Sequence, residues 1–126
     1  HLCRQAVDQP WEPDPLILDE RYVAVNVQGK GLIVFSACSH AGIVNVLLNA
    51  REVFPDVPLY GVLGGLHLAG AAMERLIPDT MAHLQQFALQ QIMPAHCTGW
   101  RALWALLNTF GESVVTPSAV GSRFTF

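Results

Sequence analysis

The chain has 126 residues, of which 52% are hydrophobic and 13% are charged. This length suits one domain, and the hydrophobic share is enough for a buried core, which argues against disorder. The formal net charge is −3, and the seven Lys and Arg residues do not cluster. The charge pattern therefore gives no indication of a nucleic-acid or membrane partner, and we expect a small-molecule substrate.

Cysteine usage and apolar run length bear on the compartment. The three cysteines Cys3, Cys38 and Cys97 are widely spaced, which disfavours a disulfide framework and predicts a cytoplasmic protein. Apolar runs such as Leu32–Ala37 are too short to cross a bilayer, so we expect a soluble protein. Because the chain begins with His1 rather than methionine, we interpret it as a segment of a longer protein.

The first half of the chain is predicted to form a connector, a hairpin and a helix. Residues 1–18 contain three prolines among acidic residues and are interpreted as a connector or loop, with a domain over 19–126. Arg21–Val27 and Leu32–Ala37 are apolar or β-branched runs on either side of the sequence QGKG, which predicts a β-hairpin. Apolar residues at helical spacing then predict a helix over 43–54.

The second half alternates strands and helices. Leu59–Leu63 is predicted as a buried strand closed by Gly64 and Gly65, which permit a sharp turn or a close backbone approach. A helix over 78–90, a strand over Gln91–Pro94, a helix ending at Gly111 and an edge strand over Val114–Thr116 follow. This order predicts an α/β fold with helices packed on a sheet.

Three of the five histidines each follow a predicted strand. They are His40, His67 and His96. Loops beyond the carboxyl ends of strands in an open α/β sheet share one edge, where ligands bind, so the three imidazoles could converge. Zinc favours imidazole nitrogens, and a catalytic zinc ion typically keeps three protein ligands and an open position for water.

Several of these residues have ordinary structural interpretations as well. His40 and His96 taken singly would suit core or capping positions, but their shared placement favours a metal site. His83 is interpreted as a helix-surface residue. Cys38 could be a buried small side chain, a metal thiolate, or a nucleophile beside His40, although positions two apart on a turn rarely face each other. Cys97 directly follows His96, so its side chain is expected to point elsewhere, and it is interpreted as a packing residue.

Thr98 and Arg101 are the candidate substrate contacts. The Thr98 hydroxyl could cap the last helix or meet a substrate anion there. Arg101, in the first turn of that helix, could bind phosphate, although a solvent-facing arginine is the commoner case. Asp19 and Glu20 could bring a carboxylate to the site, but a solvated loop is the favoured interpretation.

Three segments resemble motifs of the metallo-β-lactamase superfamily. Ala37–Asn45 (ACSHAGIVN), Gly64–Leu68 (GGLHL) and Pro94–Gly99 (PAHCTG) are similar to the GCSHAGI, GGFHL and PAHCTG motifs of its dihydropterin-ribofuranosylaminobenzene phosphate synthase-like branch. The similarity runs from about Asp19 to Gly121. Three motifs in this order are specific, whereas any one alone would be weak.

The resemblance implies half of an αββα sandwich, in which a mixed sheet carries helices on one face. The superfamily's HxHxDH motif belongs to the first half and is absent from this sequence, so the chain corresponds to the C-terminal half and the N-terminal half is an expected partner. By resemblance, His40 and His96 are metal-site residues, and His67 binds metal or orients the substrate. Ala37 and Leu66 stand where the family usually has Gly and Phe. These differences bear on the turn geometry and the pocket shape that the resemblance implies, more than on the chemistry.

The predicted function is that of a metal-dependent hydrolase. One or two zinc ions, or alternatively iron or manganese, would lower the pKa of bound water and deliver hydroxide to an ester-like or phosphorylated small molecule. The alternative is a non-catalytic half-fold that acts as a binding or assembly module. The apolar runs Leu32–Phe35 and Leu59–Leu63 predict an unpaired sheet face, through which the chain alone would associate, for example as a homo-oligomer.

Overall fold

Tyr22–Val27 (β3) and Gly31–Ser36 (β4) form the predicted hairpin in the computed structural model, which describes residues 2–4, 6–17 and 20–126. The two strands are antiparallel, and the Lys30 N–H donates to the Val27 carbonyl across the turn, at 3.0 Å. Most β4 side chains are buried, as the uninterrupted apolar run predicts.

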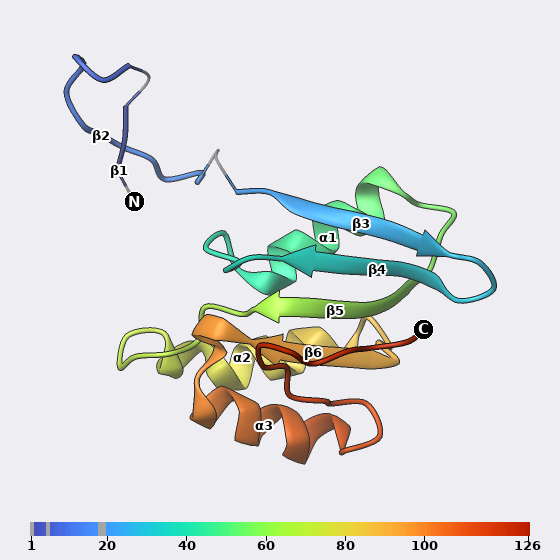
Figure 1. The fold of residues 1–126 in the computed structure, drawn as a ribbon. Helices are drawn as coiled ribbons and strands as arrows, with labels where there is room; N and C mark the ends of the chain where they lie inside the picture. Colours follow the sequence, from blue (N-terminus) through green and yellow to red (C-terminus); the bar gives the residue numbers. More distant parts are fainter. Residues whose placement is uncertain (1, 5, 18–19) are drawn as a thin grey trace.

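Two further strands extend the sheet on the other side of β4. Leu59–Gly65 (β5) pairs with β4 in parallel, and Gln91–Ala95 (β6) pairs with β5 in parallel, so the order is β3-β4-β5-β6. Ile43–Val53 (α1) connects β4 to β5, and Ile77–Gln85 (α2) connects β5 to β6. The predicted mixed α/β sheet is therefore confirmed (Figure 1).

Three more helical elements complete the domain. Trp100–Phe110 (α3) follows β6 and packs against α2. Two short 3-10 helices, Glu74–Leu76 (η1) and His96–Thr98 (η2), precede α2 and α3 respectively. They were not predicted, and η2 moves the start of the last helix so that Gly99 is its N-cap.

The described residues of the N-terminal segment, 2–4 and 6–17, form an arm away from the sheet (Figure 1). Leu2–Cys3 (β1) pairs antiparallel with Glu12–Pro13 (β2), so the arm contains a short ladder rather than loop alone. The Arg4 guanidinium lies 4.6 Å from the centre of the Trp11 ring, a further contact within the arm.

The hydrophobic core lies on one face of the sheet. Alternate side chains of a strand point to opposite faces, and Val34, Val62 and Ile92 share the face that the helices cover. Leu47 of α1 and Leu106 of α3 join them in one cluster and are fully buried. The expected arrangement, a mixed sheet with helices on one face, is thus observed.

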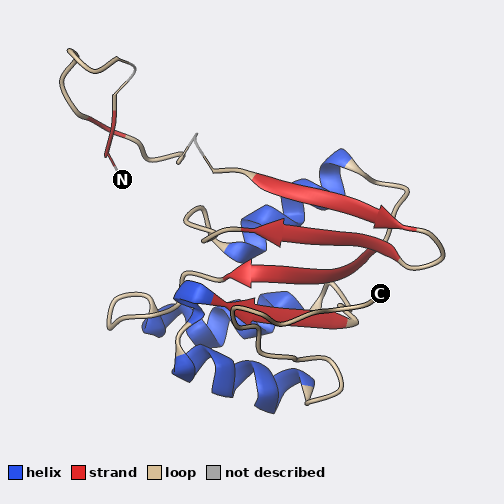
Figure 2. Cartoon of the chain, in the orientation of Figure 1, coloured by secondary structure: helices blue, strands red, loops and turns tan. Residues whose placement is uncertain are grey.

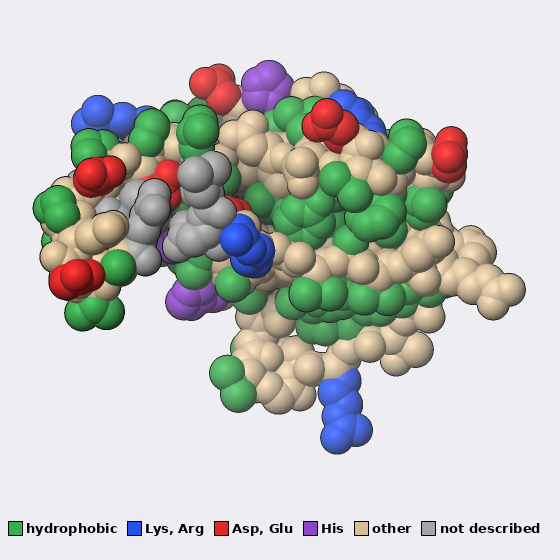
Figure 3. Space-filling view, turned by 90° about the horizontal axis from the view of Figure 1, so that it is seen from above, with side chains coloured by type: hydrophobic (Ala, Val, Ile, Leu, Met, Phe, Trp, Pro, Cys, Tyr) green, Lys and Arg blue, Asp and Glu red, His purple; other side chains and the backbone are tan. Residues whose placement is uncertain are grey.

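The opposite face exposes hydrophobic side chains at its edge strand. Val23 and Val25 of β3 are 61% and 45% exposed, and hydrophobic side chains gather beside this strand in Figure 3. The runs Leu32–Phe35 and Leu59–Leu63, which motivated the expectation of an unpaired face, contain only buried and half-buried residues. On this face of the sheet, the exposed large hydrophobic side chains therefore lie on β3 rather than on those central strands.

Three elements depart most from the sequence predictions, while the others differ by one residue at an end. The helix predicted over 78–90 ends at Gln85, because Gln86 to Gln90 turn back toward β6. Val114–Thr116 forms only a single parallel bridge, Ile92 to Val115, rather than a full strand. Gly64 and Gly65 are the last residues of β5 and do not follow it as a turn.

No helix among the described residues is long and apolar enough to span a membrane.

Gly64 and Gly65 permit the close backbone approach that their sequence predicts. Gly64 has φ +140°, and a Cβ there would collide with the backbone carbonyl oxygen of Ser36. A Cβ at Gly65 would lie 2.6 Å from the Cys97 sulfur and 2.7 Å from the Ala37 carbonyl oxygen. An amino acid with a side chain does not fit at either position. The two glycines therefore allow the ends of β4 and β5 and the loop after β6 to lie close together.

Replacing Gly64 with alanine is expected to destabilise the fold strongly. Gly29 provides a matched control, since it also has a positive φ, +76°, but nothing lies within 4 Å of its added Cβ. Strain and overpacking together should lower the free energy of unfolding by about 3–5 kcal/mol in Gly64→Ala, against about 1–2 kcal/mol of strain in Gly29→Ala. Urea unfolding measures both values, and equal losses would contradict the assigned close approach.

Candidate metal centre

The loops that carry the predicted site residues share one edge of the sheet. The arrowheads of β4, β5 and β6 point to the same edge (Figure 2), and His40, His67 and His96 lie in the segments that follow these strands. Each loop holds one non-glycine residue in the left-handed region: Ser39 at φ 58°, His67 at φ 51° and His96 at φ 49°. Such backbone costs about 1–2 kcal/mol per residue and tends to cluster at functional sites.

Ser39 fastens the first loop to the second strand end. Its buried hydroxyl donates to the Gly65 carbonyl at 2.7 Å and lies 2.8 Å from the Ser36 hydroxyl. Since each hydroxyl has one proton, Ser36 donates to Ser39. The hydroxyls of Ser36 and Ser39 therefore hold the loop that carries His40 against the end of β5.

Thr98 fastens the third loop to the second. Its hydroxyl donates to the Ala95 carbonyl at 2.8 Å and accepts from the Leu66 N–H at 3.2 Å. The residue is only 3% exposed, and no side chain caps α3. The expectation that Thr98 caps the last helix is therefore wrong. Its hydroxyl instead connects the segment after β5 to the end of β6.

His40 and His67 form a pair. Their ring centroids are 4.5 Å apart, with the rings edge to face at 70°. His40 is exposed and His67 is half-buried, so both rings are accessible from solvent. Two imidazoles at this separation come from loops 27 positions apart in the sequence, as the strand-end prediction required.

His96 lies in a second group with two cysteines. The ligand atoms of Cys38, His96 and Cys97 are all within 4.8 Å of one another. Thiolate sulfur and imidazole nitrogen are ligands that zinc prefers, and tetrahedral zinc with bonds of about 2.0–2.3 Å places its ligand atoms about 3–4 Å apart. The described residues therefore offer a donor set that fits a soft or borderline metal ion after small side-chain movements.

Cys97 is the residue that sequence reasoning missed. Its thiol donates to the Cys38 carbonyl at 3.4 Å, and its sulfur accepts from the His67 N–H at 3.3 Å. Burial raises the pKa of the Cys97 thiol, the neighbouring Cys38 thiol raises it further, and the His67 N–H opposes both. The expectation that Cys97 is only a packing residue is wrong, because it joins all three loops.

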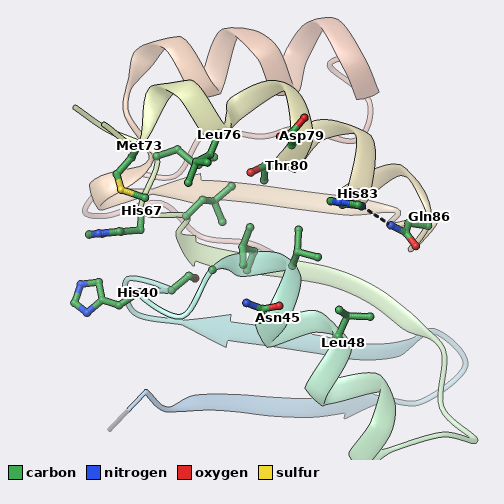
Figure 4. A pocket seen from close by; sticks show the side chains of 16 residues that line it. His40, Asn45, Leu48, His67, Met73, Leu76, Asp79, Thr80, His83 and Gln86 are labelled. Atoms are coloured by element: carbon green, nitrogen blue, oxygen red, sulfur yellow. Dashed lines mark hydrogen bonds between the residues drawn. The ribbon is translucent and has the colours of Figure 1, made fainter. Parts of the chain in front are cut away.

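A pocket of about 520 Å³ opens beside the histidine pair, between α1 and α2. In Figure 4 the rings of His40 and His67 lie together at one end, and His83 lies toward the other. The walls are largely apolar and include Leu48, Leu66 and Leu76. His96 lines a separate pocket of about 300 Å³, together with Trp100.

The remaining predicted residues lie outside the two groups of donors. Arg101 is 59% exposed, and its Nε lies 3.4 Å from the Glu74 carboxylate. His83 is exposed in the last turn of α2, and its Nδ1 lies 3.0 Å from the Gln86 side-chain nitrogen, which agrees with a helix-surface residue.

The Glu20 carboxylate accepts from the Ala41 N–H at 2.9 Å, so it holds the His40 loop, whereas a solvated loop position was expected. Asp19 lies outside the described residues.

The predicted residues thus gather at one edge, but in two groups rather than one. His40 and His67 form the first group, and His96 with Cys38 forms the second. Cys97 and Glu20 are the residues that the structure adds to this edge, Cys97 beside His96 and Glu20 at the Ala41 N–H. The sequence signal that could have found Cys97 is its place inside the third strand-end motif, directly after His96.

Comparison with known proteins places this arrangement in a family context. No protein-family model matches the chain. The chain is 36% identical over 94 residues to a 7,8-dihydropterin-6-methyl-4-(β-D-ribofuranosyl)-aminobenzene-5′-phosphate synthase of Methanocaldococcus jannaschii, a match that covers 75% of this chain and 31% of the synthase. It is also 38% identical over 86 residues to an uncharacterised protein of the same organism, covering 64% of this chain and 30% of that protein.

A solved structure agrees with these sequence matches. Tm1679, described as a metal-dependent hydrolase of the β-lactamase superfamily, superposes with a TM-score of 0.73 and 28% identity, over 82% of this chain and 39% of Tm1679. The predicted resemblance to the metallo-β-lactamase superfamily is confirmed. The chain spans about a third of the length of the curated relatives that it matches.

Replacing Thr98 with valine tests the joint between the second and third loops. Valine keeps the shape of threonine but leaves the Leu66 N–H and the Ala95 carbonyl without their buried partner. The free energy of unfolding should fall by about 1–3 kcal/mol. The exposed Thr125 is a matched control whose valine variant should stay within about 0.5 kcal/mol. Unchanged urea unfolding of Thr98→Val would contradict this structural role.

Proposed function

We propose that the protein is a metal-dependent hydrolase of ester-like or phosphorylated small molecules, to which this chain contributes the C-terminal half of the catalytic domain. The observation that supports the proposal is the assembly of imidazole and thiol donors at the carboxyl edge of β4, β5 and β6. A solved relative is described as metal-dependent, and a curated relative is a synthase. Ligands from the N-terminal half of the same protein complete the site in this proposal.

His40 and His96 are the proposed metal ligands, with zinc as the first choice and iron or manganese as alternatives. A bound ion supplies Lewis acidity, which lowers the pKa of water and polarises a substrate oxygen. The sulfur atoms of Cys38 and Cys97 lie close enough to His96 to join it as ligands or to surround it. Glu20 and Ser39 hold the His40 loop in place through the Ala41 N–H and the Gly65 carbonyl.

His67 is the proposed substrate-orienting residue. Its ring contacts the His40 ring and lines the pocket between α1 and α2. The pocket's apolar walls suit the hydrophobic part of a small molecule, and its volume of about 520 Å³ lies in the range of ligand pockets. The reacting group would then lie at the histidine end, where an imidazole nitrogen of His67 can hydrogen-bond to it.

A second candidate function is a non-catalytic binding or assembly module. The observation that favours it is the exposed apolar edge strand, at which Val23 and Val25 remain uncovered in this chain. The N-terminal half of the protein or a second copy of the chain could cover this surface. Metal content separates the two candidates, because a module of this kind should contain no metal in the full-length protein.

Histidine variants of the full-length protein test the metal ligands. His40→Ala and His96→Ala should each lower the metal content, because each removes a proposed ligand. His83→Ala should leave the content unchanged, since His83 lies on α2 and bonds to Gln86. Elemental analysis of the purified variants measures the content. Full occupancy in both strand-end variants would rule out the assignment.

Arginine variants test the preference for an anionic substrate. Arg101 is exposed, and its ion pair with Glu74 is of the surface kind that contributes only about 0–1 kcal/mol, so a phosphate can displace the carboxylate. Arg101→Ala should reduce kcat/KM for phosphoesters by roughly ten- to a hundredfold, the equivalent of one charge-assisted hydrogen bond. It should leave the kcat/KM of neutral esters and the metal content unchanged.

Two companion variants make this test specific. Glu74→Gln removes the competing carboxylate and should raise kcat/KM for phosphoesters, while Arg123→Ala removes a distant exposed arginine and should change nothing. A substrate panel in which neutral esters react faster than phosphoesters, or an Arg101→Ala variant with normal phosphoester kinetics, would contradict the anionic substrate class.

A further inference from the structure

Two thiols from distant parts of the chain meet at the site edge. Cys38 follows β4 and Cys97 follows β6, 59 positions later, yet their sulfur atoms lie within 4.8 Å of each other. A disulfide bond is about 2.05 Å long, so rotation of the two side chains covers most of the remaining separation. Both residues are free cysteines and both are partly exposed, which leaves them accessible to a small oxidant.

The surrounding backbone keeps these thiols together. Cys97 is held through its sulfur by the Cys38 carbonyl and the His67 N–H. Gly65 lies between the two cysteines, since a Cβ at this position would lie 2.6 Å from the Cys97 sulfur and 3.2 Å from the Cys38 Cα. The missing side chain of Gly65 therefore provides the space in which the thiols face each other.

We propose that Cys38 and Cys97 are a peroxide-sensitive thiol pair that closes to an intramolecular disulfide. A hydroperoxide oxidises one thiol to a sulfenic acid and releases water or the corresponding alcohol. The second thiol then attacks the sulfenic sulfur, forms the S–S bond and releases a second molecule of water. The sulfurs lose two electrons in total, which reduce the O–O bond. A dithiol reductant returns the disulfide to two thiols and is itself oxidised to a disulfide.

The disulfide has a structural consequence that does not depend on the proposed function. It joins the loop after β4 to the loop after β6 and leaves neither sulfur with an acidic proton. The Cys97 thiol can then no longer donate to the Cys38 carbonyl, and neither sulfur is available as a thiolate ligand beside His96. The oxidised form should also have a higher Tm, because the cross-link restricts the unfolded chain.

The experiment treats the full, reduced protein with one equivalent of hydrogen peroxide, followed by alkylation of the remaining thiols under denaturing conditions. We expect an intact mass lower by about 2 Da before alkylation, the loss of two alkylatable thiols, those of Cys38 and Cys97, and a proteolytic fragment that joins residues 38 and 97. Dithiothreitol should restore alkylation of both Cys38 and Cys97. The Cys3→Ser variant is the matched control and should form the same disulfide.

Two comparisons keep the result specific. Cys38→Ser and Cys97→Ser should each form no intramolecular disulfide, and if either variant does not fold, the fragment map of the wild-type chain still decides. In guanidinium chloride the 38–97 disulfide should form at least about tenfold more slowly, because only the fold brings the thiols together. The proposal is overturned if Cys38 and Cys97 stay reduced after peroxide, if the disulfide involves Cys3, or if unfolding leaves the rate unchanged.

Discussion

The whole site depends on the close approach of three strand ends at β5. Gly64 and Gly65 have no side chains, so the Ser36 carbonyl packs directly on one and the Cys97 sulfur and Ala37 carbonyl on the other. A larger residue at either position would push β4 or the loop after β6 away. The glycines therefore determine the separation of the loops that carry His40, His67 and His96, although they supply no functional group.

Once the strand ends are this close, short side chains connect them. Ser39 donates to the Gly65 carbonyl, Thr98 receives the Leu66 N–H, and the Cys97 sulfur receives the His67 N–H. Every buried side-chain oxygen and nitrogen among the described residues has a hydrogen-bond partner. This satisfied network offsets the cost of the left-handed residues Ser39, His67 and His96, because strained backbone persists only where neighbouring contacts hold it.

The sequence predicted the positions of the histidines better than their grouping. His40, His67 and His96 were found because parallel strands end at one edge, a rule that needs only the strand pattern. Cys97 was missed because consecutive side chains were expected to point apart, as they do in a strand. Here His96 has φ 49° and begins a 3-10 turn, so the alternation ends at Ala95 and the Cys97 side chain turns back under the second loop.

Local pattern also could not reveal contacts that depend on tertiary distance. The Glu20 carboxylate reaches the Ala41 N–H across 21 positions, and nothing in the local sequence before the hairpin distinguishes it from a solvated residue. Thr98 looked like a helix cap because a threonine before a helix usually is one, but the unpredicted turn η2 made Gly99 the cap and left the hydroxyl for Leu66. The same short turn therefore accounts for both the Thr98 and the Cys97 errors. Those two residues fasten the third loop to the second, so the part of the site that was hardest to predict is also the part that holds it together.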